Sequence, residues 1–184
     1  TSRVSTGITR IYSGANTLTN WRGRCMKFTG AGLSTSHRER KNRYSKKGIS
    51  MTGRVTAIIS AYFAEDYIQG RLENLVSQTE KVDIIAVAQK GSIEAGICAR
   101  FPQVEIIQTN DIPGVYEAWN IGIKASNTPY VTNANCDDRL APHALKKMAD
   151  ILDKETTYGV VYPDVSIVEE IGGNPIGEYR WKEG

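Results

Sequence analysis

The sequence predicts an α/β fold in which a mainly parallel sheet is flanked by helices. Three short apolar runs, at residues 55–60, 82–88 and 104–109, are typical of strands buried on both faces. Segments with apolar residues at helical spacing separate these runs. Strand and helix therefore alternate, and this order favours parallel strands that are joined by crossover helices.

The first helix is expected over residues 65–78, where four apolar side chains share one face: Ile68, Leu72, Leu75 and Val76. Three further helices are expected at residues 92–100, 115–125 and 142–153, the last with Pro142 in its first turn. Strands four and five are expected at residues 130–136 and 158–162. Parallel strands end at the same edge of a sheet, so four loops should meet around one crevice: 60–63, 89–92, 110–114 and 135–138.

Charge divides the chain into two parts. Residues 1–50 hold 11 basic residues and one acidic residue, a net charge of +10, whereas residues 51–184 have a net charge of −7. We expect residues 1–50 to be a basic, Ser/Thr/Gly/Arg-rich extension, disordered or non-native, and residues 51–184 to be the folded domain. The alternative is a basic arm that contacts nucleic acid or an anionic membrane through charge and interleaved aromatic residues: Tyr12, Trp21, Phe28 and Tyr44.

Cysteine usage and hydropathy bear on the compartment. Cys25, Cys98 and Cys136 are odd in number and form no CxxC pair, which argues against a disulfide framework and a zinc site. No apolar run approaches the ~18 residues that a membrane-spanning helix needs. A cytoplasmic protein is the simplest expectation.

The stretch from Tyr130 to Arg139 carries the strongest chemical signal. A β-prone segment leads into two adjacent carboxylates, Asp137 and Asp138, before a predicted helix. Hard oxygen donors at a strand end suit a divalent cation that also binds phosphate oxygens. The alternative is that these residues cap the following helix.

Other polar residues are predicted at the same edge. The chain has neither GxGxxG nor GxxxxGK[ST], so the common dinucleotide and P-loop phosphate cradles are missing. Ser60 and Tyr62 follow the first predicted strand, Gln89 follows the second, and Asn120 lies in a predicted helix. Each has an ordinary packing or surface role as its alternative, but a bound nucleotide would give all of them a function.

Five segments occur in a fixed order: Val55-Thr-Ala-Ile-Ile-Ser-Ala-Tyr62, Leu72-Glu-Asn-Leu-Val-Ser-Gln-Thr79, residues 84–92, Ala118-Trp-Asn-Ile-Gly-Ile-Lys-Ala125 and residues 130–138. They resemble the motifs VSIIIPxYN, xxSLxxQT, EIIVVDDGS, ARNxGIxxA and YIxFLDxDD. On these segments, residues 53–170 resemble the nucleotide-sugar-binding half of family 2 glycosyltransferases. The resemblance implies the Rossmann-like GT-A fold.

The resemblance further implies transfer of a sugar from a nucleotide diphosphate, with a UDP-sugar favoured, to a hydroxyl acceptor, with inversion and with Mn²⁺ or Mg²⁺ bound. Ser60 and Tyr62 match positions that line the nucleoside pocket, and Asp137 and Asp138 match the acidic metal-binding motif. This chain departs from the family in two places. Gln89 or Lys90 replaces the usual base-reading Asp, and Asn135 replaces the first acid of the DxD motif.

In the family, the acceptor site and the catalytic base lie further along the chain. Only 46 residues follow Asp138, so we expect the C-terminal acceptor part to be missing. The nearby carboxylates are Asp164, Glu169 and Glu170, and the sequence assigns none of them as the base. A truncated donor-binding fragment and a non-catalytic structural or assembly protein are therefore alternatives. A nucleotidyltransferase ranks last, because residues 60–65 lack a Gly/Arg/Lys-rich phosphate loop.

Overall fold

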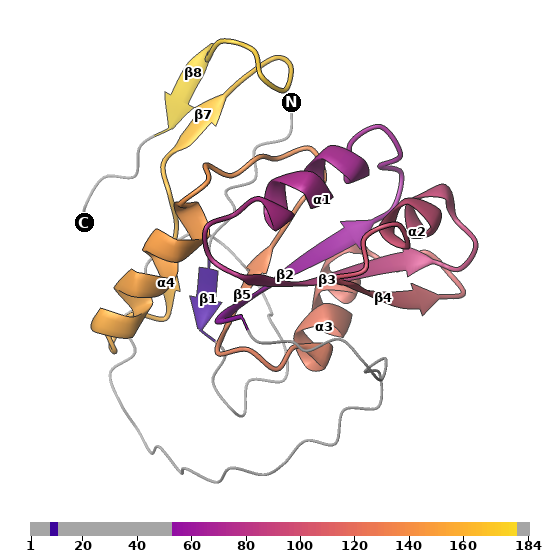
Figure 1. Cartoon of the computed structure of the whole chain (residues 1–184), viewed down its shortest axis with the longest axis horizontal. Coiled ribbons are helices and arrows are strands. Elements are labelled where there is room, and N and C mark those ends of the chain that lie inside the picture. The colour runs from indigo at the N-terminus through magenta and orange to yellow at the C-terminus, as the bar shows by residue number, and fades with distance from the viewer. Residues whose placement is uncertain (1–7, 11–52, 180–184) are drawn as a thin grey trace, which may run out of the picture.

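The computed structural model describes residues 8–10, as backbone, and 53–179. Its main sheet has six strands in the order β4-β3-β2-β5-β1-β6. Figure 1 shows the part of the sheet from β4 to β1. Four strands form the parallel part of the sheet: β2 (Val55–Ala61), β3 (Val82–Gln89), β4 (Val104–Thr109) and β5 (Tyr130–Asn133). The predicted fold class, a mainly parallel sheet flanked by helices, is confirmed.

Helices cover both faces of this sheet (Figure 1). Three helices share one hydrophobic core with the first face: α1 (Ile68–Val76), α2 (Ile93–Cys98) and α4 (Ala144–Lys154). Helix α3 (Val115–Ala125) contributes Ala118 and Ala125 to a second core on the other face. Side chains of a strand alternate between faces, so β2 and β3 need apolar residues at nearly every position.

The order of the strands creates a switch point beside β2. From β2 the chain runs through α1 to β3 on one side, and it later returns through α3 to β5 on the other side. The loops that follow β2 and β5 therefore diverge at the carboxyl edge of the sheet. Ligands of open α/β sheets bind at this position.

The segment that carries the acidic residues differs from the prediction. Strand β5 ends at Asn133 rather than at residue 136. Residues 135–138 instead form a turn, in which the Asp138 amide donates to the Asn135 carbonyl at 3.4 Å. The following helix begins at Ala144, so Pro142 lies before it rather than in its first turn. The Pro142 carbonyl instead accepts a hydrogen bond from the Thr79 amide, at 2.9 Å.

Two predictions about helix α1 are also corrected. Helix α1 is shorter than residues 65–78, because residues 65–67 form a turn and the helix ends at Val76. Val76 was predicted on the buried face but is 45% exposed, since it lies outside the stripe formed by the buried Ile68, Leu72 and Leu75. Arg71, for which no prediction was made, is fully buried, since it is spaced i+3 from Ile68 and therefore shares the buried stripe of α1.

The far edge of the sheet also differs from the prediction. The fifth predicted strand, residues 158–162, is reduced to β6 (Val160–Val161), which pairs antiparallel with β1 (Ile8–Arg10). Strand β1 also pairs antiparallel with β5. Three residues of the predicted extension therefore join the sheet, whereas the aromatic residues proposed for a basic arm lie outside the described residues. The domain boundary near residue 51 stays a prediction.

A small hairpin follows the main sheet. It consists of β7 (Val165–Ile167) and β8 (Gly177–Tyr179), which pair antiparallel as a separate two-stranded sheet (Figure 1). Within the described part of the chain, none of the helices combines the length and the apolar character needed to cross a membrane.

Candidate functional site

A cavity of about 450 Å³ opens at the carboxyl edge of the sheet. Its walls come from the loops after β2, β4 and β5, and from the starts of α1 and α3: Ser60, Tyr62, Phe63, Ala64, Tyr67, Ile112, Pro113, Val115, Asn135, Cys136 and Asp137. Three of the four loops predicted to meet at this edge do line the cavity. Residues 89–92 do not.

The Tyr62 side chain is held by the sheet and the core rather than free in the cavity. Its hydroxyl shares a 2.9 Å hydrogen bond with the Thr109 hydroxyl at the end of β4, and its ring packs against the core under α3. Burial raises the pKa of Tyr62, and the nearby Glu117 carboxylate raises it further, against the opposing effect of the Thr109 bond. Tyr62 is therefore a neutral, held ring in the cavity wall, beside Ser60.

Phe63 was not predicted as a site residue, yet it is the most exposed aromatic side chain of the described residues at 82%. Its backbone has φ of 52°, a left-handed conformation that is costly for a bulky residue and that clusters at functional sites. A signal was available in the sequence, since the motif VSIIIPxYN has Asn after its Tyr where this chain has Phe63.

Glu94 fixes the same loop from α2. Its carboxylate accepts a 3.1 Å hydrogen bond from the Ala64 amide, and the side chain is buried. Burial alone would raise the pKa of Glu94. Hydrogen bonds from Ala64 and neighbouring groups outweigh burial and lower it. An ionised Glu94 therefore anchors the loop that presents Tyr62 and Phe63.

The two predicted metal ligands lie differently. Asp137 is exposed and lines the cavity, whereas Asp138 is half-buried and does not line it. The Asp138 carboxylate accepts a 3.1 Å hydrogen bond from the Asn135 side-chain amide. Asn135, which stands in place of the first acid of the motif, thus orients Asp138 and also reaches the cavity wall.

Side chains of α1 hold the loop that carries these acids. The Arg71 Nη1 atom donates to the Asp138 carbonyl at 3.1 Å, and Arg139 Nη1 donates to the same carbonyl at 2.8 Å. The Asn74 side chain bonds both the amide and the carbonyl of Leu140, each at 2.9 Å. Sequence reasoning missed Arg71, because a basic residue in an amphipathic helix normally lies on its exposed face.

Cys136 is the buried residue at the centre of the acidic loop. Its thiol donates to the Ser60 carbonyl at 3.7 Å, which links the loops after β2 and β5. Burial raises the pKa of Cys136 to about 12 and that of Cys98 to about 11. Both thiols therefore stay protonated at neutral pH and serve packing rather than nucleophilic chemistry.

Two further residues that were predicted to contact the nucleotide do not line the cavity. The Gln89 side chain donates to the Asn110 carbonyl at 3.2 Å and braces the loop after β4. Asn120 is half-buried on α3, which covers the opposite face of the sheet from α1. Nucleotide contacts by Gln89 and Asn120 stay predictions.

The side chains of Asp137, Asp138 and Asn135 suit only an open metal site. No three His, Cys, Asp or Glu side chains gather into a metal-binding group among residues 53–179. Two neighbouring carboxylates with an amide beside them nevertheless suit Mg²⁺ or Mn²⁺, since such ions keep several waters and share one or two carboxylates with substrate phosphates. The residues fit a cation that a diphosphate helps to hold, not a closed protein cage.

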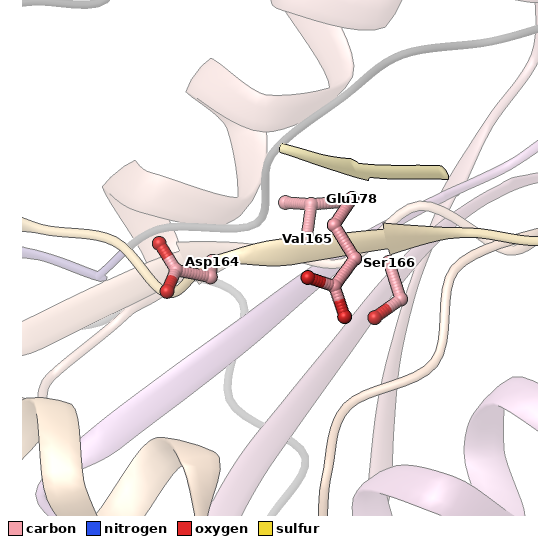
Figure 2. Close-up of a pocket in the computed structure, with 4 residues that line it drawn as sticks. All are labelled: Asp164, Val165, Ser166 and Glu178. Carbon is pink, nitrogen blue, oxygen red and sulfur yellow. The ribbon is translucent and has the colours of Figure 1, made fainter. Parts of the chain in front are cut away.

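A smaller cavity of about 220 Å³ lies on the β7–β8 hairpin and is lined by Asp164, Val165, Ser166 and Glu178 (Figure 2). Ser166 and Glu178 face each other across the hairpin, and Asp164 lies just before β7. Asp164, one of the three carboxylates considered as a base, thus lines a different cavity from the one that contains Asp137.

Comparisons with known proteins agree with this geometry. The comparison with curated proteins returns no match. The family model described as glycosyl transferase family 2 matches residues 56–178, which is more than half of the chain and includes every cavity-lining residue. A parallel sheet with its cavity at the switch point, together with this match, places the chain in glycosyl transferase family 2 and supports glycosyl transfer in general.

Proposed function

We propose that this chain binds a nucleotide-diphosphate sugar in the cavity at the switch point, for metal-dependent transfer of the sugar to a hydroxyl acceptor. The observation that carries the proposal is that Ser60, Tyr62 and Asp137 line one cavity, although two different loops supply them. A cavity of about 450 Å³ is within the ~300–1,000 Å³ of small-molecule sites.

The walls divide the cavity into two chemically different parts. Tyr62, Phe63 and Tyr67 supply aromatic surface on which a base can stack, so this part suits the nucleoside. Asp137 and Asn135 supply oxygen donors on the opposite loop, next to Asp138. A cation bound there supplies Lewis-acid neutralisation of the charge on the departing diphosphate. UDP is the nucleotide that the family resemblance favours, and this preference does not rest on Gln89, because its amide donates to the Asn110 carbonyl and Gln89 does not line the cavity.

Inversion by a single displacement needs a carboxylate that takes the proton from the acceptor hydroxyl. Asp164 lines the hairpin cavity, and Glu169 and Glu170 are exposed beyond β7. We therefore assign no residue among 53–179 as this base, and the acceptor stays unspecified beyond its hydroxyl group.

A second candidate function is a non-catalytic assembly or donor-binding protein with the same fold. The observation that favours it is that none of the three carboxylates considered as a base lines the cavity of Asp137. Nucleotide binding without sugar transfer to any acceptor tested would support this candidate.

The test is calorimetric titration of the full chain with UDP and with GDP, each in Mn²⁺ and in EDTA. We expect micromolar UDP binding that EDTA removes. Asp137→Asn should abolish the cation-dependent part of binding. Asp111→Asn makes the same charge change at an exposed position outside the cavity wall and should bind normally. Absence of binding to both nucleotides by the wild-type chain would refute the proposal.

A further inference from the structure

Arg71 is an unusual residue to find in the core of this domain. Its side chain is fully buried, at 0% exposure, and it is the largest of the fully buried side chains. Nη1 donates to the Asn74 side chain and to the Asp138 carbonyl, each at 3.1 Å. The Nε and Nη2 atoms are buried without a hydrogen-bond partner.

A buried guanidinium with unpaired donors is strongly unfavourable for folding. Burial lowers the pKa of Arg71 to about 10, while the Asp138 carboxylate acts in the opposite direction. Arg71 therefore remains charged at neutral pH. Because burying this charge is costly, we expect the charge of Arg71 to have a function.

Bracing the loop does not need a charge. Neutral amides in α1 and just after it already hold the neighbouring residues, since Asn74 bonds Leu140 and Gln78, two residues beyond the end of α1, donates from Nε2 to the Ala141 carbonyl at 3.1 Å. Arg71 contacts the carbonyl of Asp138, one of the two predicted metal ligands of this loop. The charge is thus placed beside the acidic pair rather than anywhere along the helix.

Arg139 adds a second positive charge at the same point. Its Nη1 atom donates to the carbonyls of Cys136 and Asp138, each at 2.8 Å. Helix α1 leaves room for it at Gly70, where an added Cβ would lie 2.6 Å from Arg139 Nη2. The two guanidinium groups offset the two carboxylates of Asp137 and Asp138, and the Glu73 carboxylate of α1 adds one further negative charge near Arg139.

We propose that Arg71 is a positioning residue that sets the charge of the acidic loop, so that a divalent cation binds tightly only together with the anionic nucleotide diphosphate. This inference rests on the proposed function. A cation alone would bring two positive charges to a loop whose two carboxylates are already offset by Arg71 and Arg139. A diphosphate supplies the missing negative charge and its own oxygen ligands.

The experiment is calorimetric titration of the full chain with Mn²⁺, alone and in the presence of UDP. For the wild type we expect weak Mn²⁺ binding alone, strengthened at least about tenfold by UDP. Arg71→Gln removes the charge and Arg71→Lys keeps it, while both lose the planar fork. Arg71→Gln should bind Mn²⁺ alone about tenfold more tightly than Arg71→Lys, with a smaller effect of UDP.

A merely structural role would change the melting temperature in both variants and leave their Mn²⁺ affinities equal, which would overturn the inference. Should neither Arg71 variant fold, Arg139→Gln and Arg139→Lys repeat the comparison at a half-buried position, with the same expected order. A wild type that binds Mn²⁺ alone as tightly as with UDP also overturns the inference, although UDP binding itself would uphold the proposed function. A wild type that binds neither Mn²⁺ nor UDP overturns both.

Discussion

The Tyr62 hydroxyl bonds the Thr109 hydroxyl across the end of β3, with 2.9 Å between the two oxygen atoms. The bond joins the loop after β2 to the end of β4, two segments that β3 separates in the sheet. Thr109 is at the same time within 3.4 Å of the Ala88 carbonyl of β3. One aromatic residue of the cavity wall is therefore fixed by the strand ends themselves.

Two substitutions of Tyr62 distinguish the contribution of its hydroxyl group from that of its ring. Tyr62→Phe should lower the free energy of unfolding by about 1 kcal/mol and leave UDP affinity nearly unchanged, because the ring stays in the wall. Tyr62→Ala should weaken UDP binding about tenfold or more, because a stacking surface is lost. Urea unfolding and UDP titration measure the two effects. Tyr116→Phe, at an exposed tyrosine, is the control and should change neither quantity.

Phe63 combines a costly backbone with an exposed ring. Asn tolerates a φ of 52° better than Phe does, so Phe63→Asn should raise the free energy of unfolding by about 1 kcal/mol. Phe63→Ala keeps the backbone cost and should not stabilise the domain. Both variants lose the ring from the cavity wall and should weaken UDP binding about tenfold. Stabilisation of both variants to the same extent would show that the backbone is not strained at this position.

Much of this architecture could be predicted from the pattern of apolar residues. Strand β4 and helix α3 were predicted with the bounds that they have, because each is a continuous periodic segment with clear breaks. The carboxyl-edge cavity followed from the alternation of strand and helix, together with Ser60, Tyr62 and Asp137 in its wall.

The contacts that are not local in sequence could not be predicted. Strand β1 pairs with β5 more than a hundred residues later, and a three-residue strand carries almost no periodicity. Helical spacing places Arg71 on the buried face of α1, but its contact with the Asp138 carbonyl 67 residues later is one that no local pattern indicates. The turn at residues 135–138 likewise depends on the Asn135–Asp138 bond rather than on strand propensity.

Gly122 is required by close packing of α3 on the sheet. An added Cβ would lie 2.3 Å from Cγ2 of Ile58 in β2, a contact that a packed core cannot accommodate without movement. Gly122→Ala should therefore destabilise the domain by about 1–3 kcal/mol, measured by urea unfolding.

Gly96→Ala is the matched control for this substitution. Gly96 is exposed on α2 with open space around its Cα, so alanine there should stabilise the domain by about 0.5–1 kcal/mol. Equal effects of the two substitutions would contradict the packing of α3 against β2. Gly122→Ala combined with Ile58→Ala should be less destabilising than the sum of the two single substitutions, since Ile58→Ala removes Cγ1 and Cγ2, two of the atoms that the added Cβ would meet.

Glu105 and Asp83 are two buried carboxyl groups on adjacent strands, and Glu105 Oε1 has no hydrogen-bond partner. Burial raises the pKa of Glu105, and the charge of Asp83 raises it further. A carboxyl group whose pKa is raised on folding contributes most to stability below its unfolded pKa, and this contribution is lost as the pH rises through the folded pKa.

Glu105→Gln should consequently raise the melting temperature at pH 7, because the neutral amide avoids the burial of a charge beside Asp83. The advantage of the variant should shrink as the pH is lowered through about 4, below which the wild-type carboxyl group becomes protonated in both states. Thermal unfolding across this pH range measures the difference. Glu155→Gln makes the same charge change at an exposed position and should give no comparable rise. An advantage of Glu105→Gln that stays constant with pH would mean that the ionisation of Glu105 does not limit the stability of the folded domain.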